Sequence, residues 1–333
     1  MQNLRLRMIT AGLGVIHSPN AVGSEQIAGC GRLAPMDWPS GIFRREQALQ
    51  QYGRARVEYW LQSGAWTRRF SGVYASADMP ADDPRLDIRL AVESVGDLVV
   101  VRESAAVLHG FGILGSETVH LAGGPAKTAR SRPGLQTHGY KLAPNEIARV
   151  DGMRVTTAER TVVDLARSSN RLDALAVIDA ALRIEACTPE TLAAQADSQR
   201  SSRGIVQARQ IIKWGDGDAE SPMESRARLR ILDSDLPTPV LQWWVCDGLG
   251  RQIYRLDLGW PERKVGLEYD GVDHLDKPRQ RHDIERQAWL SANGWRILHV
   301  TDVDVYRLHH RMITRLNSLL TDRQDQSPSQ LAS

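Results

Sequence analysis

The sequence predicts a multidomain α/β protein: an N-terminal winged helix-turn-helix, a mixed α/β middle region and a C-terminal domain with the element order αβββαβα. Three observations lead to this prediction. Two short helical patterns precede a basic strand pair over residues 43–75, strand patterns give way to helical ones near Thr156, and a capped helix, three strands and a second helix follow Ser221. At 333 residues the chain is long enough for two or three hydrophobic cores.

Changes in composition place the expected boundaries. Residues at both ends lack sustained periodicity and are rich in small and polar side chains, so we expect them to be disordered. The Gly- and Asp-rich stretch 215–219 separates the last domain from the rest. The expected segments are a disordered tail at 1–36, the winged helix-turn-helix at 37–80, an α/β connecting domain at 81–217, the C-terminal domain at 218–321 and a second disordered tail at 322–333.

Charge and cysteine content restrict the class of protein. The formal net charge is +2, so any basic surface that binds nucleic acid must be local. Cys30, Cys187 and Cys246 are far apart and form no CxxC motif, which argues against a disulfide framework or a zinc knuckle. This usage suits a reducing cytoplasm, and no apolar run approaches the length of a bilayer span. We therefore expect a cytoplasmic protein with no membrane partner.

The N-terminal pattern describes a small winged helix-turn-helix. FRREQALQQYG predicts a short helix from Phe43, residues 54–63 predict a second helix, and TRRFSGVYAS predicts the strands of a wing. The arginines expected on the second helix and the wing are Arg54, Arg56, Arg68 and Arg69. Their guanidinium groups are suited to DNA phosphates and base edges. The alternative is a solvated arginine-rich face on a domain that binds protein.

The succession FRREQALQQYG, VEYWLQSGAWTRRFSGVYA and SAAVLHGFGIL spans roughly residues 40–115. It resembles the N-terminal winged-helix segment of AbiE-type abortive-infection antitoxins. The resemblance implies binding of operator DNA. A homodimer and a partner toxin are both left open by the sequence.

The middle region changes from strands to helices. Strands are expected at 98–102, 117–121, 135–140 and 147–155, and four helices are expected after Thr156. Thr188 followed by Pro189 is a good helix start, because threonine caps the first turn and proline fits its first position. The region shows no catalytic constellation. Its scattered histidines, His109, His120 and His138, are expected to be packed or at the surface, without a role as ligands.

The C-terminal domain begins with a helix capped at Ser221. Pro222 follows, and Glu224 completes an S/T-x-x-E capping box. The later elements are expected as strands at 240–246, 251–258 and 265–270, a helix at 277–293, a strand at 295–300 and a helix at 303–320. Two roles are open for Glu224: it caps its own helix, or it reaches into a cluster of carboxylates on the strands.

That cluster lies in the stretch RLDLGWPERKVGLEYDGVDH, residues 255–274. Side chains alternate along a strand, so Glu268 and Asp270 share one face, and antiparallel pairing brings Asp257 close to both. His274 follows at the exit of the hairpin. Crowded carboxylates repel one another, and a divalent cation would relieve this repulsion. The alternative is that these carboxylates are solvated charges on an exposed hairpin.

Four motifs occur in order over residues 219–320: ESPMESRARL, the strand with Asp257, VGLEYDGVDH and RQRHDIERQAWLSANGWRILHVT. They resemble the very-short-patch-repair-like endonuclease domains of the PD-(D/E)xK nuclease superfamily. The resemblance implies a restriction-endonuclease-like fold and hydrolysis of DNA phosphodiester bonds. It also implies a Mg²⁺ or Mn²⁺ ion held by Asp257 and Glu268, which would polarise the phosphate and lower the pKa of a bound water.

The remaining members of the cluster receive roles from the same resemblance. Asp270 stands where better-known members of the superfamily carry lysine, and a carboxylate cannot stabilise a phosphorane charge as lysine does. It is left to hold a second metal or to orient a water. His274 is expected to act as general base or acid, and Glu224 to touch the metal through water.

Three further residues complete the predicted site. Asp283 and Arg286 lie one helical turn apart, so they can pair and position His274. Arg286 can instead contact the phosphate. Arg296, which opens the last strand, is a second candidate for phosphate contact.

Two functions follow from these patterns. The first is a metal-dependent endonuclease that the winged helix brings to double-stranded DNA. The alternative is a non-catalytic, antitoxin-like DNA-binding regulator in which the nuclease-like domain serves only binding or dimerisation. The second hypothesis gains weight from Asp270, because the usual lysine is missing there.

Overall fold

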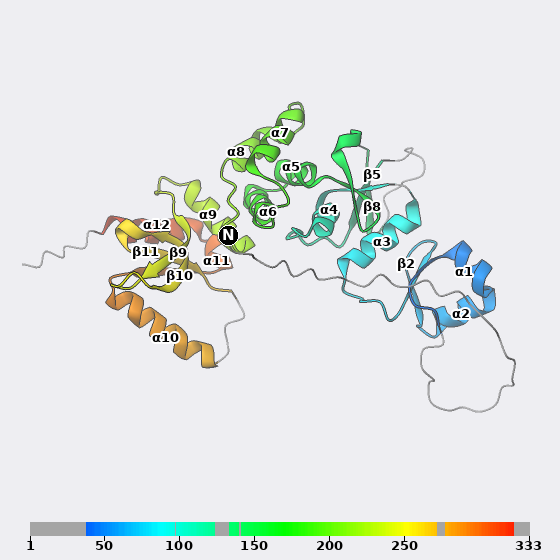
Figure 1. Cartoon of the computed structure of the whole chain (residues 1–333), viewed down its shortest axis with the longest axis horizontal. Coiled ribbons are helices and arrows are strands. Elements are labelled where there is room, and N and C mark those ends of the chain that lie inside the picture. The colour runs from blue at the N-terminus through cyan, green and yellow to red at the C-terminus, as the bar shows by residue number, and fades with distance from the viewer. Residues whose placement is uncertain (1–37, 97, 124–132, 140, 272–276, 323–333) are drawn as a thin grey trace, which may run out of the picture. The chain divides into compact units, whose positions relative to one another are not determined.

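The structure is a computed structural model that describes residues 38–322, except 97, 124–132, 140 and 272–276, with backbone alone in 277–282 (Figure 1). The described residues form twelve α-helices and three β-sheets, which confirms a mixed α/β protein. The predicted tail at 1–36 and all but the first residue of the predicted tail at 322–333 lie outside the described residues. The domain boundaries stay predictions.

Two helices lie along the chain between the first and second strands of the first sheet. The order along the chain is β1 (Ile42–Arg44), α1 (Arg45–Tyr52), α2 (Arg54–Gln62), β2 (Trp66–Phe70) and β3 (Val73–Ser76). In space the strands follow the order β1-β3-β2, and both pairs are antiparallel. Gly53 separates the two helices with φ 77°, a conformation that L-residues with a side chain rarely adopt. The sequence predicts both helices and the hairpin, but not β1.

Aromatic side chains hold this sheet to its helices. Trp66 of β2 is buried, and its ring lies 4.8 Å from Trp60 of α2 and 4.6 Å from Phe43 of β1 between centroids. Tyr52 of α1 meets the Trp60 ring edge-on at 5.2 Å. Large aromatic rings bury much apolar area each, so a small unit can gain a stable core from a few of them.

The second sheet has five strands in the order β6-β5-β4-β8-β7. Its strands are β4 (Val99–Val100), β5 (Val119–Ala122), β6 (Leu135–His138), β7 (Ile147–Val150) and β8 (Met153–Thr156), and the helices α3 (Pro84–Val95) and α4 (Arg102–His109) precede β4 and β5. The strand predicted at 147–155 is a hairpin, because the chain turns at Asp151 and Gly152, both with positive φ.

Four helices follow this sheet and share one core. They are α5 (Ala158–Ser168), α6 (Arg171–Arg183), α7 (Pro189–Ser198) and α8 (Ile205–Ile212), with buried Leu165, Leu175, Ile178, Leu192 and Ile211 between them. Three of the helices begin with a side-chain cap: Thr157, Asn170 and Thr188 each accept a hydrogen bond from a first-turn backbone N–H.

The C-terminal elements follow the order that the sequence predicts. They are α9 (Pro222–Leu232), β9 (Val240–Cys246), β10 (Gln252–Trp260), β11 (Val265–Tyr269), α10 (Lys277–Ala292), β12 (Arg296–Val300), α11 (Asp302–Tyr306) and α12 (His309–Thr321). The strand order is β12-β11-β10-β9, and only β11 and β12 are parallel, joined through α10. The expected final helix is divided in two at Arg307 and Leu308.

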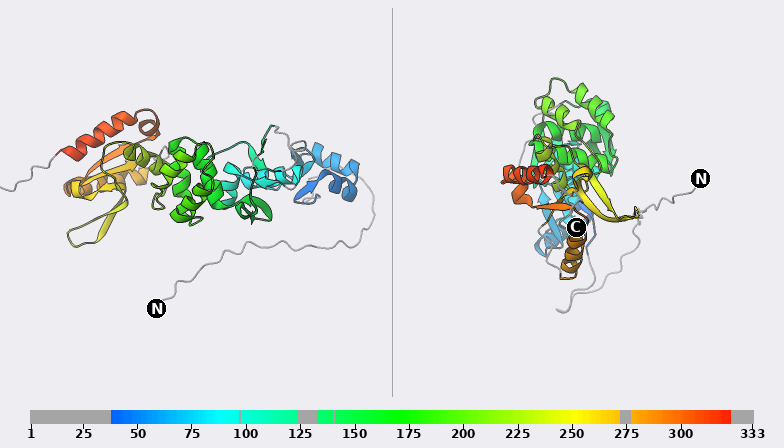
Figure 2. Two further views of the ribbon diagram at one scale, coloured as in Figure 1. Left: turned by 90° about the horizontal axis from the view of Figure 1, so that it is seen from above. Right: turned by 90° about the vertical axis from the view of Figure 1, so that its left-hand side faces the viewer.

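Helices cover both faces of this third sheet (Figure 1). On one face Leu258, Leu267 and Leu298 pack with α9 and α12 through residues such as Met312 and Leu316. On the other face a smaller core joins the sheet to α10 through Leu290. The ribbon of β9 and β10 extends beyond the rest of this C-terminal part (Figure 2).

Candidate functional site

A cleft of about 560 Å³ lies between the third sheet and α10. Five of the residues that the sequence singles out line it: Asp257, Glu268, Asp270, Asp283 and Arg286. The remaining lining residues are Tyr269, Gly271, Ile284, Gln287 and His299. Asp257 and Glu268 thus lie together in this cleft, on the paired strands β10 and β11.

Strand register brings Asp257 and Glu268 side by side. β10 and β11 pair Leu258 with Leu267, so the next position along this antiparallel ladder sets Asp257 opposite Glu268. One carboxylate oxygen of Asp257, Oδ2, accepts the backbone N–H of Tyr269 at 2.9 Å. This hydrogen bond fixes the Asp257 carboxylate beside the end of β11.

The side chains of β10 change from one face of the sheet to the other at Asp257. Leu256 packs in the core beneath α10, whereas Leu258 packs in the core with α9 and α12, although residues two apart on a regular strand share a face. Gln242 of β9, which lies opposite Asp257, has φ 49°, an uncommon conformation for a strand residue with a side chain. Alternation from Leu258 already places the Asp257 side chain on the cleft side, and the irregularity brings Leu256 to that same side. No sequence pattern predicts this change.

Ser221 caps α9, while the Glu224 carboxylate binds the N–H of the residue before the cap, in place of the Ser221 N–H of the predicted capping box, and its charge acts on the cluster. Its own N–H is bound by Ser221 Oγ at 3.2 Å, and its Oε2 accepts the N–H of Glu220 at 3.0 Å. The same oxygen accepts a hydrogen bond of 2.7 Å from Gln242 Nε2. Glu224 does not line the cleft, but it is buried and its charge acts on Asp257. Contact with a metal through water stays a prediction.

Burial raises the pKa of Asp257 to about 6. The negative charges of Glu224 and Glu268 raise the pKa further, while the Tyr269 N–H and the charge of Arg286 oppose the increase. A carboxyl group with a pKa near neutrality in a cleft is a candidate functional group, because it exchanges a proton under physiological conditions.

Arg286 binds Glu268 with both ends of its guanidinium group. Its Nη1 donates to Glu268 Oε2 at 2.6 Å, and its Nη2 donates to Glu268 Oε1. Nη2 also donates to the backbone carbonyl of Arg255 at 2.8 Å. Arg286 thus pairs across to β11, and the exposed Asp283 side chain lies on the rim of the cleft, where its charge also acts on Arg286. The positioning of His274 by these two residues stays a prediction.

His299 contacts Asp270, the carboxylate that stands where better-known nucleases of the resembled superfamily carry lysine. His299 of β12 is the register partner of Glu268, and its Nδ1 lies 3.1 Å from Asp270 Oδ2. Its Nε2 is 2.6 Å from the amide nitrogen of Gln287 on α10. His299 was not predicted from the sequence. The available signal was a polar residue within the apolar run Ile-Leu-His-Val of this strand.

Besides Glu224, two predicted residues are not among those that line the cleft. His274 lies outside the described residues. Arg296 pairs with Val265 at the start of β12, three residues from the His299 position, so its side chain leaves the opposite face of the strand. Its nearest acidic partner is Asp322 at 4.0 Å. A phosphate contact by Arg296 therefore requires DNA on another face of this sheet.

The described carboxylates do not fit a divalent cation in this arrangement. Mg²⁺ and Mn²⁺ prefer oxygen ligands of the kind that Asp257 and Glu268 offer. However, both oxygens of Glu268 bind Arg286, and one oxygen of Asp257 binds a backbone N–H. Within the described part of the chain, no group of three or more histidine, cysteine, aspartate or glutamate side chains is arranged to hold a metal.

Of the four arginines predicted to contact DNA, two form ion pairs and two do not form one among the described residues. Arg54 is exposed on α2 and forms an ion pair of 2.7 Å with Glu58, and Arg69 of β2 forms one of 2.6 Å with Asp87 of α3. Arg56 is exposed on α2 and has no acidic partner among residues 38–322 as described. The fourth, Arg68, is exposed and stacks its guanidinium group 5.6 Å from the centre of the Tyr74 ring.

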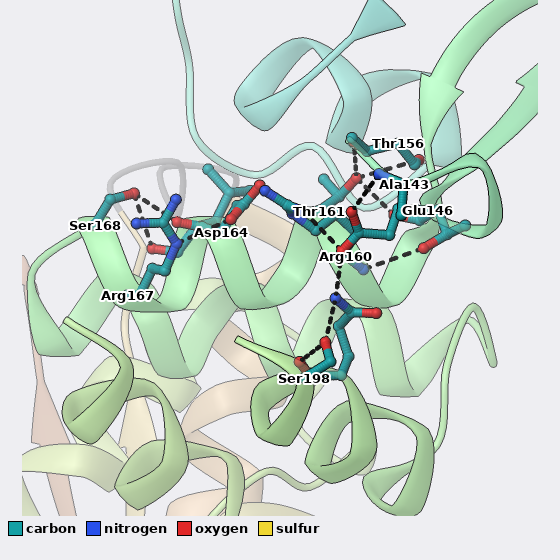
Figure 3. A network of polar contacts seen from close by, with 12 residues as sticks. Ala143, Glu146, Thr156, Arg160, Thr161, Asp164, Arg167, Ser168 and Ser198 are labelled. Carbon is teal, nitrogen blue, oxygen red and sulfur yellow. Dashed lines mark hydrogen bonds and ion pairs between the residues drawn. The ribbon is translucent and has the colours of Figure 1, made fainter. Parts of the chain in front are cut away.

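A second cleft, of about 950 Å³, lies in the middle region, and Glu146, Arg160 and Arg167 are among its lining residues. These three residues belong to an ion-pair network along α5, which Figure 3 shows. Arg160 binds Glu146 at 2.7 Å and Asp164 at 2.7 Å, and Arg167 binds Asp164 at 2.9 Å. No constellation was predicted here from the sequence. The available signal was the Arg160 and Asp164 pair at i, i+4 spacing on a predicted helix.

Two of the histidines expected to be scattered form a pair. His120 of β5 and His138 of β6 lie on neighbouring strands, with 2.9 Å between Nδ1 and Nε2. His109 stands apart and its Nε2 contacts the backbone carbonyl of Thr156 at 2.7 Å. The pairing of β5 with β6 creates this contact, so spacing in the sequence could not reveal it.

None of the helices in the described residues combines the length and the apolar character needed to cross a lipid bilayer. Comparison with known proteins adds a family relation. Residues 98–214, which hold the second sheet and the α5–α8 core, match the AbiEi antitoxin C-terminal domain. The AbiE resemblance expected from the sequence covers residues 40–115 instead, so the two overlap only in the first part of the match.

Two curated relatives cover most of the chain. They are the uncharacterized protein MT2308 of Mycobacterium tuberculosis strain CDC 1551 / Oshkosh and the uncharacterized protein Rv2248 of strain ATCC 25618 / H37Rv. Each is 34% identical over 267 residues, which are 79% of this chain and 95% of the relative. The chain therefore belongs to the same family as these two mycobacterial proteins.

Proposed function

We propose that this protein is an antitoxin-like regulator that binds double-stranded DNA. The observation that carries the proposal is the match of residues 98–214 to the AbiEi antitoxin C-terminal domain. The two mycobacterial relatives add no activity of their own, because both are uncharacterized. A homodimer or a partner toxin would be the protein partner of such a regulator.

The DNA contact is proposed for residues 42–76. Two helices between the first and second strands, with the strand order β1-β3-β2, support a winged helix-turn-helix. In that arrangement α2 would enter the major groove and the β2–β3 hairpin would lie against the backbone. Arg56 and the exposed Tyr59 on α2, together with Arg68 on β2, are the side chains that can reach DNA without breaking an ion pair.

A mobility-shift assay on DNA upstream of the protein's own gene tests this proposal. Removal of one phosphate-binding side chain lowers the slope of log affinity against log salt by about 0.9, so Arg56→Ala and Arg68→Ala should each weaken binding and flatten the slope. Arg89→Ala, which removes the same charge from an exposed position on α3, is the matched control and should bind like the wild type. Unchanged affinity and slope in both test variants would remove residues 42–76 from the DNA-binding surface.

A metal-dependent DNA endonuclease is the second candidate. The observation in its favour is the carboxylate pair Asp257 and Glu268 on paired strands, with the pKa of Asp257 raised to about 6 by burial and by neighbouring charges. This function requires Mg²⁺ or Mn²⁺ on the two carboxylates, and hence that Arg286 leaves Glu268. Asp270, Glu224 and His274 would complete its site as the sequence predicts.

Plasmid nicking distinguishes the two candidates. Supercoiled DNA is incubated with the full chain and Mg²⁺ or Mn²⁺, beside Asp257→Ala and Glu268→Ala. Nicking that both substitutions abolish would establish the endonuclease. Absence of nicking, with salt-dependent binding retained in both variants, is the result expected for the regulator.

A further inference from the structure

The positively charged guanidinium group of Arg286 lies among the carboxylates of the cleft. Glu268 is buried, with 7% of its surface exposed, and both of its oxygens are bound by the guanidinium group of Arg286. A bidentate pair of this kind is among the strongest side-chain interactions, because two parallel charge-assisted hydrogen bonds form at once. The pair joins the third strand of the sheet to the helix that follows it.

Arg286 is held in this position from several sides. Its Nη2 also donates to the Arg255 carbonyl at 2.8 Å, and its guanidinium group stacks 5.7 Å from the centre of the Tyr254 ring. One turn further along α10, Leu290 is fully buried against the sheet. The helix therefore presents Arg286 to Glu268 as a fixed group, with little freedom to move aside.

The charges explain why a cation is needed there. Glu224, Asp257 and Glu268 are three carboxylates whose charges interact, and Glu224 and Glu268 are both buried. Buried like charges destabilise a fold unless an opposite charge compensates them. Arg286 supplies that compensation from within the chain, and its charge acts on Asp257 as well as on Glu268.

We infer that Arg286 is the resident counter-cation of this carboxylate cluster, and that a divalent cation binds there only when Arg286 leaves Glu268. A divalent cation and the guanidinium group need the same two oxygens of Glu268. They also repel one another, so the two occupancies exclude each other. The cluster of the resting protein is thus neutralised by the chain itself.

Titration with Mn²⁺ alone tests this inference on the full chain. Calorimetry is carried out on the wild type, on Arg286→Gln and on the double variant Arg286→Gln/Glu268→Gln. Removing the guanidinium group exposes the carboxylate cluster, so Arg286→Gln should bind Mn²⁺ at least about tenfold more tightly than the wild type, a difference of about 1.4 kcal/mol. The double variant should lose this gain, which assigns it to the cleft.

A second variant covers the case in which Arg286→Gln does not fold. Arg286→Lys keeps the positive charge but offers a point charge that cannot bridge both oxygens of Glu268. Its Mn²⁺ affinity should therefore lie between those of the wild type and Arg286→Gln. Melting followed by circular dichroism shows which variants are folded. Equal Mn²⁺ binding by the wild type and the variants, or no binding by any of them, would overturn the inference. Because the titration contains no DNA, its outcome does not depend on whether residues 42–76 bind DNA.

Discussion

His138 is kept neutral by its surroundings on β6. Burial lowers its pKa to about 4 from an ordinary 6.5, and the neighbouring His120 lowers it in the same direction. In the unfolded chain the imidazole takes up a proton below pH 6.5, whereas in the folded chain it resists protonation until about pH 4. The unfolded state therefore binds more protons in this range, and the free energy of unfolding falls as the pH falls from 6.5 to 4.

Urea unfolding at pH 7 and pH 5 measures this effect. Because His138 is only partly buried, we expect a loss of about 1 to 2 kcal/mol from this residue, less than the full pKa difference implies. The variant His138→Gln cannot be protonated and should show a smaller loss between the two pH values. The same acid-induced loss in wild type and variant would show that other groups cause it.

Gln242 stores backbone strain opposite Asp257. Its φ of 49° lies in the left-handed region, where a side chain costs about 1 kcal/mol and glycine costs little. Gln242→Gly and Gln242→Ala both lose the hydrogen bond to Glu224, so their difference isolates the strain. We expect the glycine variant to be more stable than the alanine variant by about 1 kcal/mol in chemical denaturation. A more stable alanine variant would mean that Gln242 is not strained.

An ion pair joins the helices α6 and α9. Arg228 Nη2 binds both oxygens of Asp179, at 3.0 and 2.8 Å, and both side chains are buried. The backbone N–H of Asp216 also donates to Asp179 at 2.9 Å. Removing one partner of a buried pair leaves the other charge without compensation, which costs about 3 to 5 kcal/mol.

Substitution of each partner tests the role of this pair in helix packing. Arg228→Met should lower the free energy of unfolding by about 3 to 5 kcal/mol. The double variant Arg228→Met/Asp179→Leu should recover a large part of the loss, because no buried charge is left. A double variant as unstable as Arg228→Met would show that the pair supports packing by shape and not by charge.

The elements that the sequence predicted best are those with a strong repeating pattern. The order of the C-terminal elements was predicted because strand alternation and helical periodicity change at clear turn residues. The strand β1 and the helix α4 were missed. Each is short, and α4 begins at Arg102 with φ 57°, which local preference does not favour.

The site was predicted as far as strand pairing determines it. Asp257 and Glu268 could be paired from sequence because a hairpin fixes which residues face each other. The contact from Arg286 to Glu268 depends on how α10 rotates against the sheet, and the contact from His299 to Asp270 on a parallel strand that returns 29 residues later. Such contacts are set by packing over the whole domain, so residue spacing could not supply them.

At the scale of the molecule, charged side chains are paired locally, and the net charge of the chain does not reveal this pairing. The net charge is +2, yet Arg69, Arg228 and Arg286 each bind a carboxylate of another element. Arg56, by contrast, has no acidic partner in the part of the chain that the structure describes. The strong local pairing lets the chain carry many arginines without becoming a general polyanion binder. It also restricts the surface from which a regulator of this kind can contact DNA.

The change of face at Asp257 and Gln242 divides the β9–β10 pair, and we expect its two parts to open separately. Leu241 and Leu258 pack in the larger core with α9 and α12, whereas Val245 and Leu256, nearer the tip of the ribbon, pack in the smaller core with α10. Backbone amides in the ribbon should therefore exchange with solvent by local opening, while those near Leu258 and Leu267 should exchange only when the domain unfolds. The carboxylate cluster sits at the junction, where a local opening of the ribbon would reach it first.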